Sequence, residues 1–225
     1  MISSDEIYNW LKRDTINIDT SNKCTLQCPK CVRTKFKKNF NKIPGGWLTD
    51  YQWSLHLKHF NKFVFSGQVS DPILHPKMDK MLGDIYKENK KCIGIHVAAS
   101  HKKPEWFKKC FKANPDAWWF FGIDGLPKDS HKYRVNQDGE KLYEMMVLSK
   151  KYIKNPVWQY IIFKYNENDI DTAKNMADKE GIRFRPIMSS RYKENDPYKP
   201  SSKFVIKRND WDKVTLWQKN GNQDV

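Results

Sequence analysis

The feature of this sequence that most limits its fold is a regular alternation, from end to end, of short apolar stretches with segments of helical spacing. Such alternation is typical of an α/β fold with a parallel sheet. Units of this kind curl and bring the loops that follow the strands to one edge of the sheet. The sequence therefore predicts a partial (β/α)6 TIM-like barrel with parallel strands. The six predicted strands are residues 15–20, 62–66, 92–98, 117–123, 157–163 and 182–187.

The length of 225 residues suits one sizeable domain. We expect the barrel core to cover residues 1–187, and residues 188–225, rich in Lys, Ser and Asn, to form a polar C-terminal tail or lid. Trp211 and Trp217 are candidates to dock that tail. No apolar run reaches the roughly eighteen residues that a membrane span needs, and the first residues carry acids instead of a basic secretion signal. We therefore expect a cytoplasmic protein with no membrane partner.

The formal net charge of +15 raises the question of nucleic-acid binding, because lysine and arginine bind phosphate backbones. Only seven of the 41 basic residues are arginine, and the lysines are spread over almost every segment. A solvated basic surface explains this distribution at least as well as a binding face does. Clustering of the charge on one face would change that interpretation.

Three of the five cysteines lie within the eight residues CTLQCPKC, residues 24–31. In a reducing compartment such a group is better explained as metal ligands than as a disulfide framework. Three thiolates on a loop that leaves a strand can each hold one iron of a cubane cluster, so that the fourth iron has no protein ligand. The alternatives are chance proximity and a zinc site whose fourth ligand is His56, His59 or Cys92.

The spacing of Cys24, Cys28 and Cys31 resembles the CxxxCxxC motif of the radical S-adenosylmethionine superfamily. The segments VFSGQVSDPILHP, IHVAASHKKPEW, FGIDGLPKDSHKYR and VWQYIIFKYNENDIDTAKNMADKEGI are similar to the later units of members related to the SPASM and twitch group, which modify peptides and proteins. The likeness covers roughly residues 14–192, so it bears on topology as well as on the motif.

The resemblance implies an enzyme with two cofactors, a [4Fe–4S] cluster and S-adenosylmethionine. In the family, the open iron binds the amino and carboxylate groups of the methionine part, and one electron from the cluster breaks the C–S bond. The products are methionine and a 5′-deoxyadenosyl radical, which abstracts hydrogen from the substrate. An electron donor such as flavodoxin or ferredoxin is implied as a partner.

The resemblance also implies cofactor contacts outside the cysteine motif. Ser70 and Asp71 occupy the place where the family often has a Gly-Glu pair, and the acidic residue there accepts a hydrogen bond from the amino group of the cofactor. Arg134 matches a position that binds the carboxylate or ribose, for which a guanidinium fork is suited. Asp124 is its expected polar neighbour, and Ser100 is expected to serve the ribose.

Three features depart from the family pattern. Lys30 stands where an aromatic residue often precedes the third cysteine, and residues 97–99 read Val-Ala-Ala where relatives often have a Thr-Asn-Gly-like stretch. After Cys31 the chain has only Cys92 and Cys110, so we expect no auxiliary cluster. Both of these cysteines lie in apolar surroundings, and we expect them to pack as small apolar side chains.

The sequence favours a peptide or protein substrate over RNA, because the resembled group works on peptides and the basic charge is diffuse. Two alternatives stay open. One is an RNA-modifying enzyme of the same superfamily. The other is a non-catalytic protein that binds the cluster or the cofactor and serves as a partner subunit.

Overall fold

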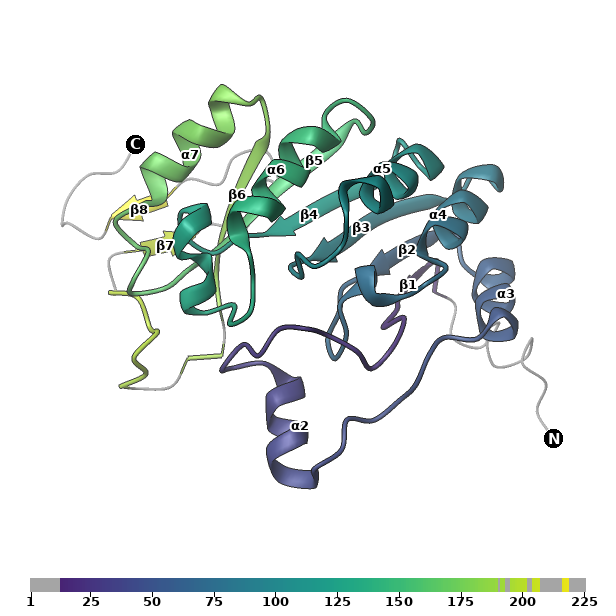
Figure 1. Cartoon of the computed structure of the whole chain (residues 1–225), viewed down its shortest axis with the longest axis horizontal. Helices are drawn as coiled ribbons and strands as arrows, with labels where there is room; N and C mark the ends of the chain where they lie inside the picture. The colour runs from purple at the N-terminus through teal and green to yellow at the C-terminus, as the bar shows by residue number, and fades with distance from the viewer. Residues whose placement is uncertain (1–12, 190, 193–194, 202–203, 207–215, 219–225) are drawn as a thin grey trace.

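The computed structural model describes residues 13–189, 191–192, 195–201, 204–206 and 216–218. All six predicted strands are present, and they form one sheet in the order β1-β2-β3-β4-β5-β6 with every neighbouring pair parallel (Figure 1). The predicted α/β fold is therefore confirmed. The strands are β1 Thr15–Asn17, β2 Lys62–Phe65, β3 Lys91–Val97, β4 Trp118–Gly122, β5 Asn155–Ile162 and β6 Arg183–Met188.

Helices join the strands and cover one face of the sheet (Figure 1). Neighbouring helices pack on one another, α3 on α4, α4 on α5 and α5 on α6. The opposite face of the sheet looks toward the loop that follows β1 and toward α2. The helices are α2 Val32–Phe40, α3 Asp50–His59, α4 Met78–Lys87, α5 Pro104–Ala113, α6 Gly139–Ser149 and α7 Ile170–Lys179, with 3-10 turns η1 Pro72–Leu74 and η2 Pro127–Lys132.

The main core lies between the sheet and these helices and is strongly aromatic. Phe111 of α5 packs edge-on against Trp119 of β4, with ring centroids 4.8 Å apart, and both side chains are fully buried. Leu142 and Met146 of α6 are also fully buried, in keeping with the helical periodicity of their segment. Burial of apolar surface on this scale supplies the main driving force for the fold.

Cap residues explain where two of the helices begin. Thr49 precedes α3, and its side-chain oxygen accepts a hydrogen bond from the Gln52 amide while the Gln52 side chain accepts one from the Thr49 amide. This reciprocal pair is a capping box. Asp138 caps α6 by accepting a hydrogen bond from the Lys141 amide at 2.9 Å. Both caps satisfy amides that the first helical turn leaves without a partner.

The helix α2 was not predicted from the sequence. None of its nine residues is buried, so its segment VRTKFKKNF has no apolar stripe from which a core-facing helix is recognised. The helix projects away from the sheet (Figure 1). It begins directly after Cys31 and ends at Asn41, which adopts a left-handed conformation with φ of 49°.

The chain beyond β6 folds back toward β5. The Tyr192 hydroxyl donates to the Ile162 carbonyl at 2.8 Å, and the Lys164 amide donates to the Tyr198 carbonyl at 3.1 Å. Two short strands follow, β7 Phe204–Ile206 and β8 Leu216–Gln218, which pair antiparallel. Trp211 lies outside the described residues, and for Trp217 only its place in β8 is described, so their docking role stays a prediction. No helix among the described residues is long and apolar enough to span a membrane.

Candidate functional site

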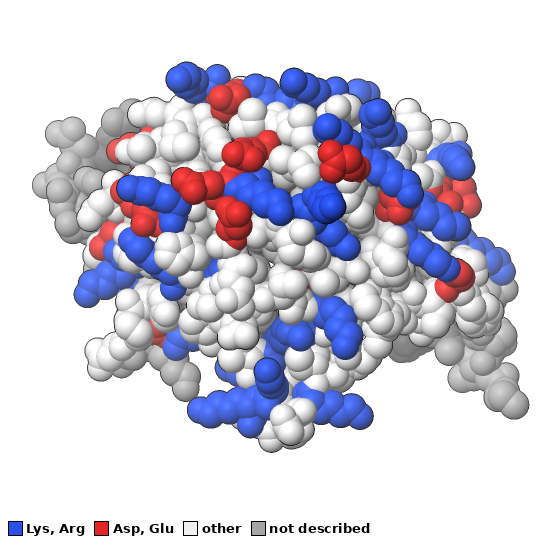
Figure 2. Space-filling model, in the orientation of Figure 1, with Lys and Arg blue, Asp and Glu red and all other residues white. Residues whose placement is uncertain are grey.

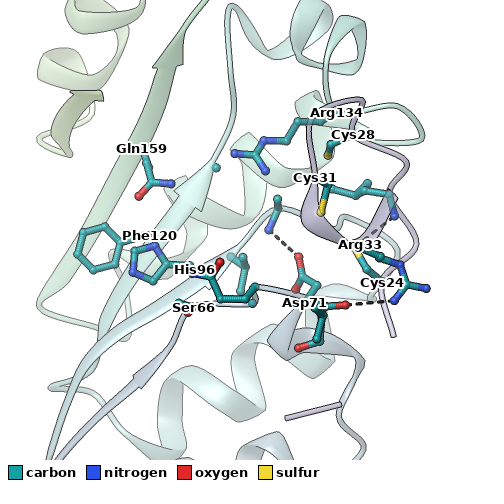
Figure 3. Close-up of a pocket in the computed structure, with 18 residues that line it drawn as sticks. Cys24, Cys28, Cys31, Arg33, Ser66, Asp71, His96, Phe120, Arg134 and Gln159 are labelled. Carbon is teal, nitrogen blue, oxygen red and sulfur yellow. Dashed lines mark hydrogen bonds between the residues drawn. The ribbon is translucent and has the colours of Figure 1, made fainter. Parts of the chain in front are cut away.

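The three clustered cysteines line one cavity of about 140 Å³ at the carboxyl ends of the strands. Cys24, Cys28 and Cys31 come from the loop between β1 and α2, and each is partly exposed. Figure 3 shows their sulfur atoms on one side of the cavity, with residues of β3, β4 and β5 on the other. Parallel strands place their following loops at one edge, which is why the sequence motif and the strand ends meet here.

Local hydrogen bonds hold the cysteine loop in shape. The Leu26 amide donates to the sulfur of Cys24 at 3.4 Å, and the Cys31 amide donates to the Cys28 carbonyl at 3.1 Å. The Thr34 hydroxyl, one turn into α2, donates to the same Cys28 carbonyl at 2.9 Å. Leu26 is buried and anchors the loop against the protein. The loop therefore presents its thiols from a defined backbone.

Burial shifts the pKa values of two thiols of this loop upward. Burial raises the pKa of the Cys24 thiol to about 12, and the Asp71 carboxylate adds to the rise. Burial also raises the pKa of Cys28, while the Arg134 guanidinium acts in the opposite direction. Thiolates in such a place are stabilised by metal cations, which deprotonate the thiols that bind them.

Three thiols that face one cavity can hold a cubane cluster. Among the residues that the structure describes, no three histidine, cysteine, aspartate or glutamate side chains lie close enough together to bind one metal ion. In a cubane each thiolate binds a different iron, so the sulfurs surround the cluster and do not converge on one point. The three thiols facing one cavity fit that requirement.

The ligands considered for a zinc site lie elsewhere. Cys92 stands at the amino end of β3, paired with Phe63, whereas the cysteine loop follows the carboxyl end of β1. His56 and His59 belong to the last turn of α3, which runs into the amino end of β2. All three residues are therefore at the opposite edge of the sheet from the cysteine loop. This placement gives no support to the zinc alternative.

Asp71 lies at the cavity and is held by backbone amides. Its Oδ2 accepts hydrogen bonds from Ala98 at 2.9 Å and Ala99 at 2.8 Å, and its Oδ1 accepts one from Ile73 at 3.2 Å. The carboxylate has about four acceptor positions, so about one remains for a ligand. Burial raises the pKa of Asp71, and the hydrogen bonds from Ala99 and Ala98 oppose the rise. The stretch that departs from the family pattern thus contacts this acid through the backbone amides of Ala98 and Ala99.

Arg134 reaches the same cavity from the segment after η2. Its Nε donates to Oδ2 of Asp124 at 2.7 Å, which leaves the outer nitrogens of the guanidinium directed at the cavity (Figure 3). Asp124 is fully buried and does not line the cavity; its other oxygen accepts from the Ile161 amide at 2.8 Å. A methyl group at Gly122 would lie 2.8 Å from Nη2 of Arg134, so the glycine makes room for the guanidinium.

The two predicted serines have different places. Ser70 lines the cavity, and its amide and hydroxyl both donate to Oδ1 of Asp19, at 3.0 and 2.9 Å. Ser100 is buried but does not line the cavity; its hydroxyl accepts from the Asp138 amide at 2.8 Å. The structure thus brings Ser70 to the cysteine loop together with Asp71 and Arg134. Ser100, in the loop after β3, instead contacts Asp138, the cap residue of α6.

Sequence reasoning missed a polar and aromatic group on the sheet. His96 of β3 and Phe120 of β4 stack with ring centroids 4.5 Å apart and planes 5° apart, and both line the cavity with Gln159 of β5. Burial lowers the pKa of His96 to about 4, with a further lowering from Arg185. A hydrogen bond with the Gln159 side chain acts against this lowering. The alternation of side chains along the strands was the available signal, since it places these residues on the face opposite the helices.

Lys30 makes an ion pair with the chain beyond β6. Its Nζ lies 2.6 Å from Oδ2 of Asp196, whose side chain is only 1% exposed. The Arg191 guanidinium also donates to the Lys30 carbonyl, at 3.4 Å. The position that is often aromatic in the resembled family therefore ties the cysteine loop to the C-terminal segment in this chain.

Comparison with known proteins gives structural matches. No family model matches the sequence, and no curated protein matches it. Among solved structures, anSMEcpe with bound AdoMet aligns with a TM-score of 0.64 at 15% identity, over 82% of this chain and 53% of that one. SuiB of Streptococcus suis bound to S-adenosylmethionine aligns with a TM-score of 0.63 at 14% identity, over 82% and 41% of the two chains.

A third structure, methylornithine synthase (PylB), aligns with a TM-score of 0.56 at 12% identity, over 82% of this chain and 57% of that one. These structural neighbours are radical S-adenosylmethionine enzymes. The chain therefore has the fold of radical S-adenosylmethionine enzymes, as its motif predicted, and it spans about half the length of anSMEcpe.

Proposed function

We propose that this chain is a radical S-adenosylmethionine enzyme that holds a [4Fe–4S] cluster on Cys24, Cys28 and Cys31 and binds S-adenosylmethionine in the adjoining cavity. One observation carries the proposal. The three thiols of a CxxxCxxC motif line the same cavity as Asp71 and Arg134, at the carboxyl edge of a six-stranded parallel sheet with this fold.

The residues around the cavity suit the two ends of the methionine part of the cofactor. Asp71 keeps about one acceptor position for the amino group, and its three backbone hydrogen bonds fix its direction. Arg134 offers its outer nitrogens to the carboxylate, and Asp124 fixes the guanidinium plane. Cys24, Cys28 and Cys31 would hold the cluster, which would supply the one electron needed for reductive cleavage of the C–S bond of S-adenosylmethionine.

The other predicted contacts divide into two roles under this proposal. Ser70 stands at the cavity and keeps the loop after β2 close to Asp19, so we assign it to the cofactor contact surface. Asp124 positions the Arg134 guanidinium. Ser100 positions the start of α6, where its hydroxyl accepts a hydrogen bond from the Asp138 amide. Residues 188–225 are proposed as a polar tail or lid, and the Lys30–Asp196 pair ties the described part of this segment to the cysteine loop.

The favoured substrate is a peptide or a protein. Two structural neighbours were solved with peptides, anSMEcpe with AdoMet and Cp18Cys peptide and SuiB with precursor peptide SuiA. In this chain Gln159, His96 and Phe120 face the cavity from the sheet, and they offer hydrogen bonds and a flat apolar surface to a bound chain. RNA modification and a non-catalytic cofactor-binding role are the competing hypotheses.

The test begins with anaerobic reconstitution and measurement of bound iron, sulfide and S-adenosylmethionine. Reduction with dithionite is then expected to yield 5′-deoxyadenosine and methionine in equal amounts. Gly122→Ala is expected to weaken cofactor binding about tenfold, because the new methyl group displaces the Arg134 guanidinium, while iron content stays unchanged. Gly46→Ala is the matched control, since nothing lies within 4 Å of its added methyl group.

Two results distinguish the competing hypotheses. Cofactor binding without cleavage by a fully reduced cluster contradicts the enzyme proposal and supports the non-catalytic role. Deuterium transfer into 5′-deoxyadenosine from labelled RNA, with none from labelled peptides or proteins, contradicts the peptide or protein substrate.

A further inference from the structure

The projecting helix α2 has a one-sided charge. Figure 2 shows Lys and Arg side chains, and no acidic ones, over the projection at the bottom of the view, where Figure 1 places α2. Between Asp19 and Asp50 the sequence has no acidic residue. It has seven basic ones, Lys23, Lys30, Arg33, Lys35, Lys37, Lys38 and Lys42. The basic charge of the protein is therefore clustered at this place, although it is diffuse along much of the chain.

Five of these seven basic residues lie in α2 or just before it, and they fall into two groups. Lys30 and Arg33 turn inward, Lys30 to Asp196 and Arg33 to the Val69 carbonyl at 3.1 Å, and they anchor the base of the helix. Lys35, Lys37 and Lys38 are exposed. Within the described part of the chain these three lysines have no ion-pair partner. Their positive charge is therefore available to attract an acidic molecule.

An apolar surface accompanies these charges. Phe40 is 68% exposed, and its ring lies 6.1 Å from that of Phe36 one turn earlier. Both rings belong to α2 itself, so they share the helix with the exposed lysines. Aromatic side chains surrounded by charge are typical of protein–protein contact surfaces.

The position of α2 relates this surface to the proposed cluster. Cys31 is the cap residue of α2, and the Lys35 amide donates to its carbonyl at 3.3 Å. The helix lies on the side of the cysteine loop away from the sheet (Figure 1). A protein seated on α2 therefore comes close to the cluster ligands without entering the cavity that serves cofactor and substrate.

We propose that α2, through Lys35, Lys37, Lys38 and Phe40, docks an acidic one-electron carrier protein of the flavodoxin or ferredoxin kind. The inference rests on the proposed function, because only a cluster-bearing protein needs the electron. The carrier is oxidised by one electron and the cluster is reduced by one, and no bond or proton is exchanged.

The chemistry of the surface favours this partner over a nucleic acid. The exposed cations are lysines, which act as mobile point charges, whereas Arg33, with the fork suited to phosphate, is turned inward. A nine-residue helix offers a small contact area, and electron-transfer encounters are at the small end of protein interfaces. Opposite charges on two such surfaces raise the rate of association and make it salt-dependent.

Binding is measured first on the apoprotein, so that docking is tested apart from cluster chemistry. The probe is an acidic flavodoxin, titrated against the wild type and the triple variant Lys35→Glu, Lys37→Glu, Lys38→Glu at low and moderate salt. The variant is expected to bind about tenfold or more weakly and to lose most of the salt dependence. The matched control Lys87→Glu, Lys151→Glu, Lys179→Glu makes the same change in net charge at the amino edge of the sheet.

Electron transfer is measured second, as the rate of cluster reduction by reduced flavodoxin and by dithionite. The α2 variant is expected to be slow with flavodoxin and normal with dithionite, while the control variant is normal with both. Equal losses in both triple variants, unchanged binding by the α2 variant, or an RNA oligonucleotide that α2 binds in preference to flavodoxin would overturn the proposal. Failure of dithionite to drive cofactor cleavage counts against the proposed function alone, since the binding result stands by itself.

Discussion

The carboxyl edge of the sheet and its helix-covered face use cysteine for opposite purposes. At the carboxyl edge Cys24, Cys28 and Cys31 are partly exposed and line a cavity that they share with charged side chains. Under the helices Cys92 is 4% exposed and Cys110 is fully buried, and both belong to the apolar core. The position of a cysteine relative to the strand ends thus separates the proposed cluster ligands from the cysteines that pack in the core.

The two regions also differ in how they are stabilised. The helix-covered face depends on apolar burial, with side chains such as Trp119 and Phe121 fully buried. The carboxyl edge depends on directed polar contacts, since Asp71 and Asp124 are both buried with their oxygens engaged. A region held by polar contacts can keep charged groups aimed at a cavity, whereas an apolar core cannot.

The largest expected effect concerns the cysteines and tests whether those of the two regions differ in cluster assembly. Replacement of Cys24, Cys28 or Cys31 by alanine is expected to abolish cluster assembly, because each thiolate holds one iron of the proposed cluster. The Cys92→Ala and Cys110→Ala variants are expected to retain about four iron and four sulfide ions per chain. Iron and sulfide analysis with absorption spectra checks this. Retention of the cluster by a Cys28→Ala protein would contradict the assignment.

The next effect concerns the polar contacts of the carboxyl edge. Asp124→Ala leaves the buried Arg134 guanidinium and the Ile161 amide without their partner, so it is expected to lower the free energy of unfolding by about 3–5 kcal/mol. Asp129→Ala, which removes the more exposed Lys132–Asp129 pair, is expected to cost less than about 1 kcal/mol. Chemical denaturation of the two variants compares them, and equal losses would show that burial of the pair is not what matters.

The same contrast explains how much the sequence could predict. The strands and the cysteine motif are short-range patterns, and all six strands and the meeting of Cys24, Cys28 and Cys31 at one cavity followed from them. The Lys30–Asp196 pair joins residues far apart in the chain, and no local pattern marks it. The helix α2 was missed because the apolar stripe that reveals a helix comes from buried positions, and no residue of this helix is fully buried.

The site residues show a similar division. The family resemblance implied Asp71 and Arg134, in the segments after the second and fourth strands, and the structure brings both to the cavity. His96 was overlooked because a histidine inside a strand has no distinctive spacing. Its part in the cavity depends on stacking with Phe120, which belongs to another strand and is set by sheet register.

A smaller effect tests His96 through pH. The folded-state pKa is lowered to about 4, below the roughly 6.5 of an unfolded histidine, so the unfolded chain binds a proton in this window that the folded chain does not. Stability is therefore expected to fall as the pH drops from about 6.5 to about 4, by on the order of 1 kcal/mol per pH unit from this group. Denaturation curves of wild type and His96→Gln over this range measure the difference, and parallel pH profiles would refute the burial of a neutral imidazole.

The smallest effect returns to the two kinds of cysteine and separates packing from ligation. Cys110→Ala removes a fully buried sulfur beside Phe107 and Phe111, so the apoprotein is expected to lose about 1 kcal/mol of stability. Cys31→Ala removes a partly exposed thiol and is expected to stay within about 0.5 kcal/mol of the wild-type apoprotein. With the cluster reconstituted the order reverses, because the ligated form is stabilised by binding that only the Cys110→Ala protein retains. Thermal unfolding of both variants, with and without the cluster, detects this reversal, and an unchanged order in the two states would mean that Cys31 is not a ligand.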